Sequence, residues 1–213
     1  HLSERSMREI YFPAFMACVK EANALSFMAA YNSFDGIPCS SHKWLLTDVL
    51  RKEWGFKGIV VSDYFSVLGI FDKHQTAESK AEAAKQAVEA GLDVELPHPD
   101  CFLELASLVE TGKISIESID ECVRRILMIK FWSGLFDNPY VDPDYAEKIC
   151  NCNEHRQLAL KAAQKSIVLL KNHENILPLD KNIKSIAVIG PNANEERLGG
   201  YSAREIKVVT ALE

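Results

Sequence analysis

Residues 57–64 hold the side chains of this chain best suited to chemistry. A run of Val and Ile at residues 59–61 is followed, after one serine, by the carboxylate of Asp63 and the ring of Tyr64. Val and Ile favour a strand buried on both faces, as in a parallel sheet, and a carboxylate at the C-terminal end of such a strand lies where α/β barrels carry their active sites. A carboxylate beside a flat ring suits sugar chemistry, because its charge meets a developing cation while the ring stacks on a pyranose. Asp63 suits the capping of a following helix equally well, so this stretch alone leaves both interpretations open.

Short motifs surround this stretch in a fixed order. They are Phe27-Met28-Ala29-Ala30-Tyr31-Asn32, Asp35-Gly36-Ile37-Pro38, Trp44-Leu45-Leu46-Thr47-Asp48-Val49-Leu50-Arg51, Trp54-Gly55-Phe56, Ser62-Asp63-Tyr64 and Ala90-Gly91-Leu92-Asp93-Val94-Glu95-Leu96-Pro97. Each is weak alone, but the ordered set closely resembles glycoside hydrolase family 3, the family of β-glucosidases and β-xylosidases. The resemblance runs from about Arg5 to the C-terminus, and it includes Ala187 to Ala193 and Gly199-Gly200-Tyr201-Ser202.

The pattern of apolar residues predicts alternating strands and helices, which indicates βαβ units and a parallel sheet. We expect helices at 5–23 (interrupted at Pro13), 41–53 (with Ser41 as N-cap), 78–90, 100–111, 116–132 and 154–166, and strands at 25–31, 58–62, 92–96, 167–170 and 186–189. A turn-rich stretch at 134–145 should be free of helix and strand.

The resemblance implies an α/β fold with three parts. Residues 1–135 are expected to form the C-terminal part of a catalytic (β/α)8 TIM-like barrel, residues 136–165 an interdomain linker with a helix, and residues 166–213 the beginning of an α/β sandwich domain. No segment is apolar over the length needed to span a bilayer.

The same resemblance implies a retaining, exo-acting β-glycosidase that removes terminal β-linked glucose or xylose from oligosaccharides or glycosides. Retention needs two carboxyl groups about 5 to 5.5 Å apart, one a nucleophile and the other an acid/base. Asp63 matches the family's nucleophile. Tyr31 matches a family tyrosine whose hydroxyl approaches that carboxylate, although a core tyrosine with a satisfied hydroxyl is the alternative. Tyr64 stands where many members have Trp, so stacking on the sugar is retained while glucose or xylose preference stays open.

The family's acid/base glutamate lies in the second domain, and the resemblance places it beyond Glu213. Since the chain begins without Met at His1, we expect it to be an internal piece of a longer protein and to be inactive alone. The absence of a signal peptide therefore says nothing about export, and a periplasmic or secreted location is expected for the full-length protein rather than a cytoplasmic one. A non-catalytic carbohydrate-binding or regulatory relative with the same fold is the alternative function.

Other residues suggest chemistry less strongly. Asp93 and Glu95 share a strand face, but the resemblance assigns them to a structural stretch. Cys150 and Cys152 lie near His155 without a second ligand pair, so no metal and no organic cofactor is expected. Gly190 follows an apolar run, yet the spacing of a dinucleotide fingerprint is absent.

The composition is that of an ordinary globular protein. The 213 residues are 47% hydrophobic and 25% charged, with a formal net charge of −6. Such an acidic balance speaks against nucleic acid as a partner. The resemblance implies an oligosaccharide or glycoside substrate, and neither a nucleic-acid nor a membrane partner is expected. The oligomeric state stays open.

Overall fold

The computed structural model describes residues 2–202 and 208–212. The chain forms two compact units, His1–Val141 and Asp142–Glu213. The first unit carries every strand of the described residues. No helix in these ranges is long and apolar enough to cross a membrane.

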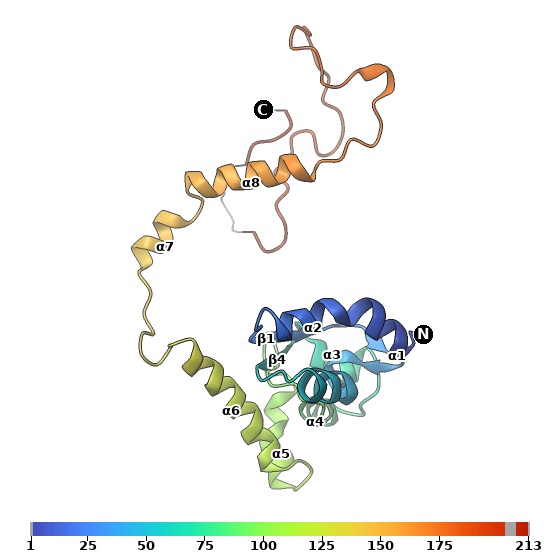
Figure 1. Ribbon diagram of the computed structural model, residues 1–213, viewed down its shortest axis with the longest axis vertical. Coiled ribbons are helices and arrows are strands. Elements are labelled where there is room, and N and C mark those ends of the chain that lie inside the picture. Colours follow the sequence, from blue (N-terminus) through green and yellow to red (C-terminus); the bar gives the residue numbers. More distant parts are fainter. Residues whose placement is uncertain (1, 203–207, 213) are drawn as a thin grey trace. The chain divides into compact units, whose positions relative to one another are not determined.

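Two parallel strands lie side by side in the first unit (Figure 1). Strand β1 (Ser26–Ala29) pairs with β4 (Ile59–Ser62) in a register that places Ala29 beside Ser62. A parallel bridge between Val61 and Val94 adds a third segment on the other side of β4. The C-terminal ends of the three segments therefore lie at one edge. A short antiparallel hairpin, β2 (Ser33–Phe34) and β3 (Ile37–Pro38), follows β1.

Helices connect the parallel segments. A π-helix, Trp44–Glu53, leads into β4, and α3 (Ser66–Asp72) and α4 (Lys80–Ala90) lead from β4 to residue 94. A 3-10 turn at Phe102–Glu104, α5 (Leu105–Glu110) and α6 (Ile116–Trp132) complete the unit. The core lies between these helices and the strands, and its fully buried side chains include Val49, Val60, Ile70, Ala87 and Leu92.

Local signals explain where several helices begin and end. Ser79 caps α4 by accepting a hydrogen bond from the Glu82 N–H, and Gly91 ends the helix at a φ of 102° that favours glycine. Ser115 caps α6 in the same way. Both helices match the predicted ranges closely, and the predicted strand at 58–62 is confirmed as β4.

Other predictions about the first unit need correction. The helix predicted from Ser41 begins at Trp44, because Ser41 lies in a 3-10 turn, Cys39–Ser41, and its hydroxyl donates to the Pro38 carbonyl instead of capping. The strand predicted at 92–96 is reduced to the bridge at Val94. Helix 5–23 divides into α1 (Glu4–Ser6), a π-helical stretch (Met7–Tyr11) and α2 (Phe12–Lys20), with Pro13 in the first turn of α2, where its missing N–H costs little.

The second unit contains α7 (Pro143–Ile149), α8 (Asn153–Ser166) and a 3-10 turn at His173–Asn175. The prediction that residues 134–145 are free of helix is wrong at its end, because α7 begins at Pro143 and proline is favoured at the first helical position. The strands predicted at 167–170 and 186–189 are wrong within the described residues. An apolar run becomes a strand only when another segment pairs with it, and here Leu170 and Ile189 stay 92% and 90% exposed.

Candidate active site

The chain turns sharply immediately after β4, and Asp63 is the first residue of that turn. The Ser66 N–H donates to the Asp63 carbonyl at 3.1 Å, and Phe65 adopts a left-handed conformation with φ 61°. Positive φ is uncommon for a large side chain, so surrounding contacts must hold this turn. Helix α3 begins directly after it, at Ser66.

The Asp63 side chain is half-buried at this edge of the strands. Its Oδ1 accepts a hydrogen bond from the Tyr64 N–H at 2.7 Å. Within residues 2–202 and 208–212 no side chain donates a hydrogen bond to this carboxylate. Asp63 therefore caps its own turn through one oxygen and leaves the other available to a ligand.

The two predicted tyrosines lie at the same edge with exposed rings. Tyr64 is 43% exposed and Tyr31 is 49% exposed. Since Ala29 pairs with Ser62, Tyr31 and Asp63 each follow the end of their strand by one or two positions. The Tyr31 carbonyl lies 2.9 Å from His74 Nε2, and both residues line a pocket of about 230 Å³ with Phe65. The structure thus brings Asp63, Tyr64 and Tyr31 to one edge.

The Asp93 carboxylate is held by structural hydrogen bonds. Its buried carboxylate accepts from Arg51 Nη2 at 2.6 Å, from Arg125 Nη1 at 2.8 Å and from the Val60 N–H at 2.7 Å. Burial lowers the pKa of Arg51, and the Asp93 charge opposes that effect. A carboxylate with three donors is not free to act on a substrate.

The Glu95 carboxylate is also held by structural hydrogen bonds. Its carboxylate accepts from the backbone N–H of Cys101 at 2.9 Å and of Phe102 at 2.7 Å, at the start of the 3-10 turn. Burial raises the pKa of Glu95, while these two N–H donors act in the opposite direction. Asp93 and Glu95 both therefore hold the fold together.

The sequence interpretation missed the roles of Ser62 and His74. Ser62 is fully buried and its hydroxyl accepts from the Leu96 N–H at 2.8 Å. A hint existed, because Ser62 directly precedes Asp63 in an otherwise apolar run. His74 carried no signal in the sequence, since its partner is a backbone carbonyl 43 residues away.

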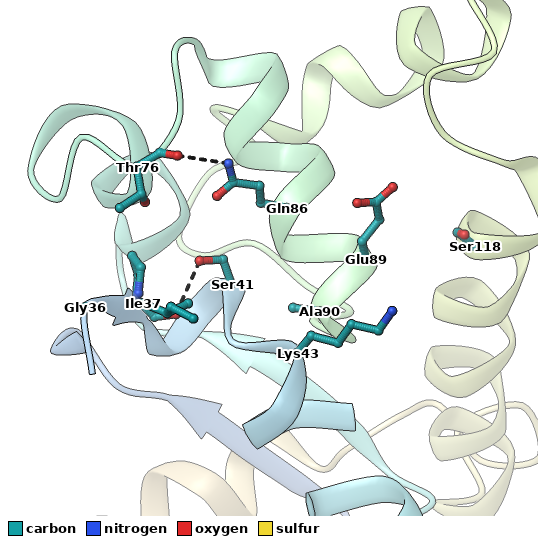
Figure 2. Close-up of a pocket in the computed structure, with 10 residues that line it drawn as sticks. Gly36, Ile37, Ser41, Lys43, Thr76, Gln86, Glu89, Ala90 and Ser118 are labelled. Carbon is teal, nitrogen blue, oxygen red and sulfur yellow. Dashed lines mark hydrogen bonds between the residues drawn. The ribbon is translucent and has the colours of Figure 1, made fainter. Parts of the chain in front are cut away.

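Another pocket of about 630 Å³ lies apart from these residues (Figure 2). The β3 region, α4 and α6 line it, with Lys43 and Glu89 as its charged side chains. Gln86 donates to the Thr76 carbonyl on one side of the pocket. Because Asp63, Tyr31 and Tyr64 are not among its lining residues, it is separate from the candidate site. The described residues contain no group of three or more His, Cys, Asp or Glu arranged to hold a metal ion.

Comparison with known proteins gives a consistent picture. Residues 1–129 match the glycosyl hydrolase family 3 N-terminal domain, and residues 167–213 match the family's C-terminal domain. A β-xylosidase from Formosa agariphila is 42% identical over all of this chain, which covers 32% of that protein.

Solved structures show the same similarity. A β-glucosidase from Erythrobacter marinus superposes with a TM-score of 0.91 at 40% identity, over 100% of this chain and 28% of that one. A β-glucosidase from Listeria innocua in complex with glucose gives a TM-score of 0.75 at 40% identity, over 84% of this chain and 24% of that one. The chain thus has an α/β fold that matches β-glucosidase structures, and it spans about a quarter to a third of the length of these relatives.

Proposed function

The chain belongs to glycosyl hydrolase family 3, and from this membership we propose that the native protein is a retaining, exo-acting β-glycosidase with Asp63 as its nucleophile. The substrates are oligosaccharides or glycosides that end in β-linked glucose or xylose. Both sugars follow from the relatives, because one is named a β-xylosidase and another is a β-glucosidase solved with glucose.

The placement of Asp63 is the observation that carries this proposal. It directly follows a buried parallel strand, its carboxylate is bonded only to the next backbone N–H among the described residues, and an exposed ring follows it. An attacking carboxylate needs such a position, held firmly by backbone yet not neutralised by a cation. Asp93, bound by two arginines, is the contrasting case in the same unit.

The reaction follows from two carboxyl groups. In the first step Asp63 attacks the anomeric carbon, the glycosidic bond breaks, and the acid/base carboxyl protonates the departing oxygen. In the second step that carboxyl removes a proton from water, which displaces Asp63 and restores the configuration of the substrate. Neither Asp93 nor Glu95 is the second carboxyl, because both are held by structural hydrogen bonds.

The proposal includes a fold for the first unit, the C-terminal part of a (β/α)8 barrel. Its three parallel segments are joined by helical connections, and their C-terminal ends carry the candidate residues, as in a barrel whose active site lies at that face. We assign residues 1–135 to the C-terminal part of a (β/α)8 barrel. Tyr31 and Tyr64, on loops that follow two of these segments, are the sugar-contacting residues of the proposed site.

Covalent trapping tests the proposal. The native full-length protein is treated with a 2-deoxy-2-fluoro β-glucoside and its xyloside counterpart, each with a good leaving group, and the labelled peptide is sequenced by mass spectrometry. We expect one sugar on Asp63, and NMR of an unmodified substrate should show the β-anomer as the first product. A label on any other residue, or an α-anomer first, would contradict the proposal.

A further inference from the structure

Three hydrogen bonds attach the Asp63 turn to the neighbouring segment of chain. The Ser62 N–H donates to the Val94 carbonyl at 2.9 Å, and the Phe65 N–H donates to the Leu96 carbonyl at 2.8 Å. Between them the Leu96 N–H donates to Ser62 Oγ at 2.8 Å. These hydrogen bonds therefore hold the backbone in place on both sides of Asp63.

The Ser62 hydroxyl takes a place that a backbone carbonyl fills elsewhere in the ladder. Along β4 the pairing with the third segment uses backbone atoms, since the Asp93 N–H donates to the Val60 carbonyl and the Ser62 N–H to Val94. The next donor, the Leu96 N–H, meets a side-chain oxygen instead. The chain can consequently leave the strand and turn at Asp63 while the Leu96 N–H stays paired.

Burial makes this contact hard to replace. Ser62 is 0% exposed. Leu96 is half-buried, so its N–H would be destabilised without an acceptor, and the removal of this hydroxyl therefore favours a shift of either segment. The left-handed conformation of Phe65, which depends on the same anchor through the Leu96 carbonyl, would shift with it.

We propose that Ser62 is a positioning residue: through the Leu96 backbone, its hydroxyl holds the Asp63 carboxylate in the orientation needed for attack on the sugar. This inference rests on the proposed function, because it assumes that Asp63 is the nucleophile. Ser62 touches neither substrate nor reacting atoms. It acts by preventing the turn from relaxing, and a small displacement of a nucleophile lowers the rate of attack steeply.

The test compares Ser62→Ala with Thr47→Val in the native full-length protein. Thr47 Oγ1 is likewise bonded to a backbone atom, donating to the Ala90 carbonyl at 2.8 Å, but this contact lies at the end of α4, before the third segment. Both substitutions delete one partly or fully buried hydroxyl with little change of volume. Thr47→Val is therefore a matched control for lost stability at a site away from Asp63.

We expect Ser62→Ala to lower kcat/KM on an aryl β-glycoside, and the rate of trapping by the fluorosugar, by about tenfold or more. The inhibition constant of the free product sugar should change less than about twofold, because uniform sugar binding does not depend on the angle of attack. Thr47→Val should keep kcat/KM and the trapping rate within about twofold of wild type at a similar loss of Tm. Unchanged trapping in Ser62→Ala, or an equal loss in both variants, would overturn the proposal.

A second measurement on the wild type serves if Ser62→Ala does not fold. Residue-resolved hydrogen exchange should show the Leu96 and Phe65 amides as slow to exchange as the Val60 amide, whose partner is the buried Asp93 carboxylate. Exchange at the rate of an open loop would remove the basis of the proposal. If the wild type is not labelled at Asp63 at all, the proposed function fails; if it is labelled and Ser62→Ala reacts normally, only the positioning role fails.

Discussion

Arg51 Nη2 lies 2.6 Å from Asp93 Oδ2, and this pair ties the π-helix Trp44–Glu53 to the third parallel segment. Arg125 of α6 adds a second cation at 2.8 Å on the other carboxylate oxygen. The Asp93 side chain is entirely buried, and the Val60 N–H of β4 donates a third hydrogen bond to it. Four parts of the first unit therefore depend on one carboxylate.

Asp93→Asn should destabilise the protein strongly. The substitution leaves the nearly buried Arg51 without its counter-charge and leaves Arg125 with only the Glu121 carboxylate at 3.3 Å. Removal of one partner from a buried pair costs about 3–5 kcal/mol. Denaturant unfolding followed by circular dichroism measures the loss. Asp48→Asn is the control, because the exposed Asp48–Lys52 pair should contribute less than about 1 kcal/mol. Equal effects of the two variants would show that the buried cluster is not a stabilising element.

Asp63→Asn should lower kcat/KM by about three orders of magnitude or more, because an amide cannot form the glycosyl ester. The melting temperature should change little, since Asp63 is half-buried and bonded only to the Tyr64 N–H among the described residues. Asp63→Gly in the presence of azide gives a sharper readout. A small anion that enters the vacated space should convert a β-glycoside into an α-glycosyl azide, and recovery without this inverted product would argue for another nucleophile.

Tyr64→Ala should raise KM for an aryl β-glycoside by about tenfold, because the exposed ring is lost as a stacking surface for the sugar. Tyr64→Trp keeps an aromatic ring and should retain a KM near that of wild type. Its larger ring should change the ratio of activity on glucoside and xyloside. The prediction fails if Tyr64→Ala binds both substrates as well as the wild type does.

The buried carboxyl of Glu95 should make stability depend on pH. Burial raises its folded-state pKa above the ordinary value of 4.5, so the protonated form is favoured in the folded state. The protonated Glu95 side chain therefore contributes to the free energy of unfolding. This contribution is fully present below the pKa of Glu95 in the unfolded state, and it is lost as pH rises through the raised pKa in the folded state. The free energy of unfolding of the wild type, relative to Glu95→Gln, should therefore fall as pH rises from 4 to 8. A constant or increasing difference would contradict the direction.

Thiol reactivity should separate the cysteines by burial. Burial raises the pKa of Cys101 and of Cys122 to about 12, so neither forms appreciable thiolate at pH 8. Cys18 and Cys150 are exposed. In native protein a maleimide should modify these two and spare Cys101 and Cys122, and all should react after denaturation. Mass spectrometry of the peptides checks the pattern, and rapid labelling of Cys122 in native protein would indicate an open core.

The sequence alone predicted those helices and strands whose boundaries depend on residues close together in the chain. The apolar spacing of 116–132 predicted α6 over the observed range, and Gly91 marked the end of α4 through contacts within one turn. The Val and Ile run before Asp63 predicted the strand that precedes the candidate carboxylate. These features depend on neighbours a few residues apart, which a sequence displays directly.

Tertiary structure alone decided what depends on distant partners. The apolar run at 186–189 has the composition of a strand, but no described segment pairs with it. Asp93 and Asp63 look alike as carboxylates near strand ends. Two arginines, 42 and 32 residues away in the sequence, neutralise Asp93, whereas no arginine in the described part of the chain binds Asp63. The Ser62 hydroxyl accepts a hydrogen bond from the backbone N–H of Leu96, which lies 34 residues away in the sequence. Hydrogen bonds and ion pairs across such separations are set by how the helices pack on the strands, so the order of residues determined the candidates and the packing decided which of them is free to react.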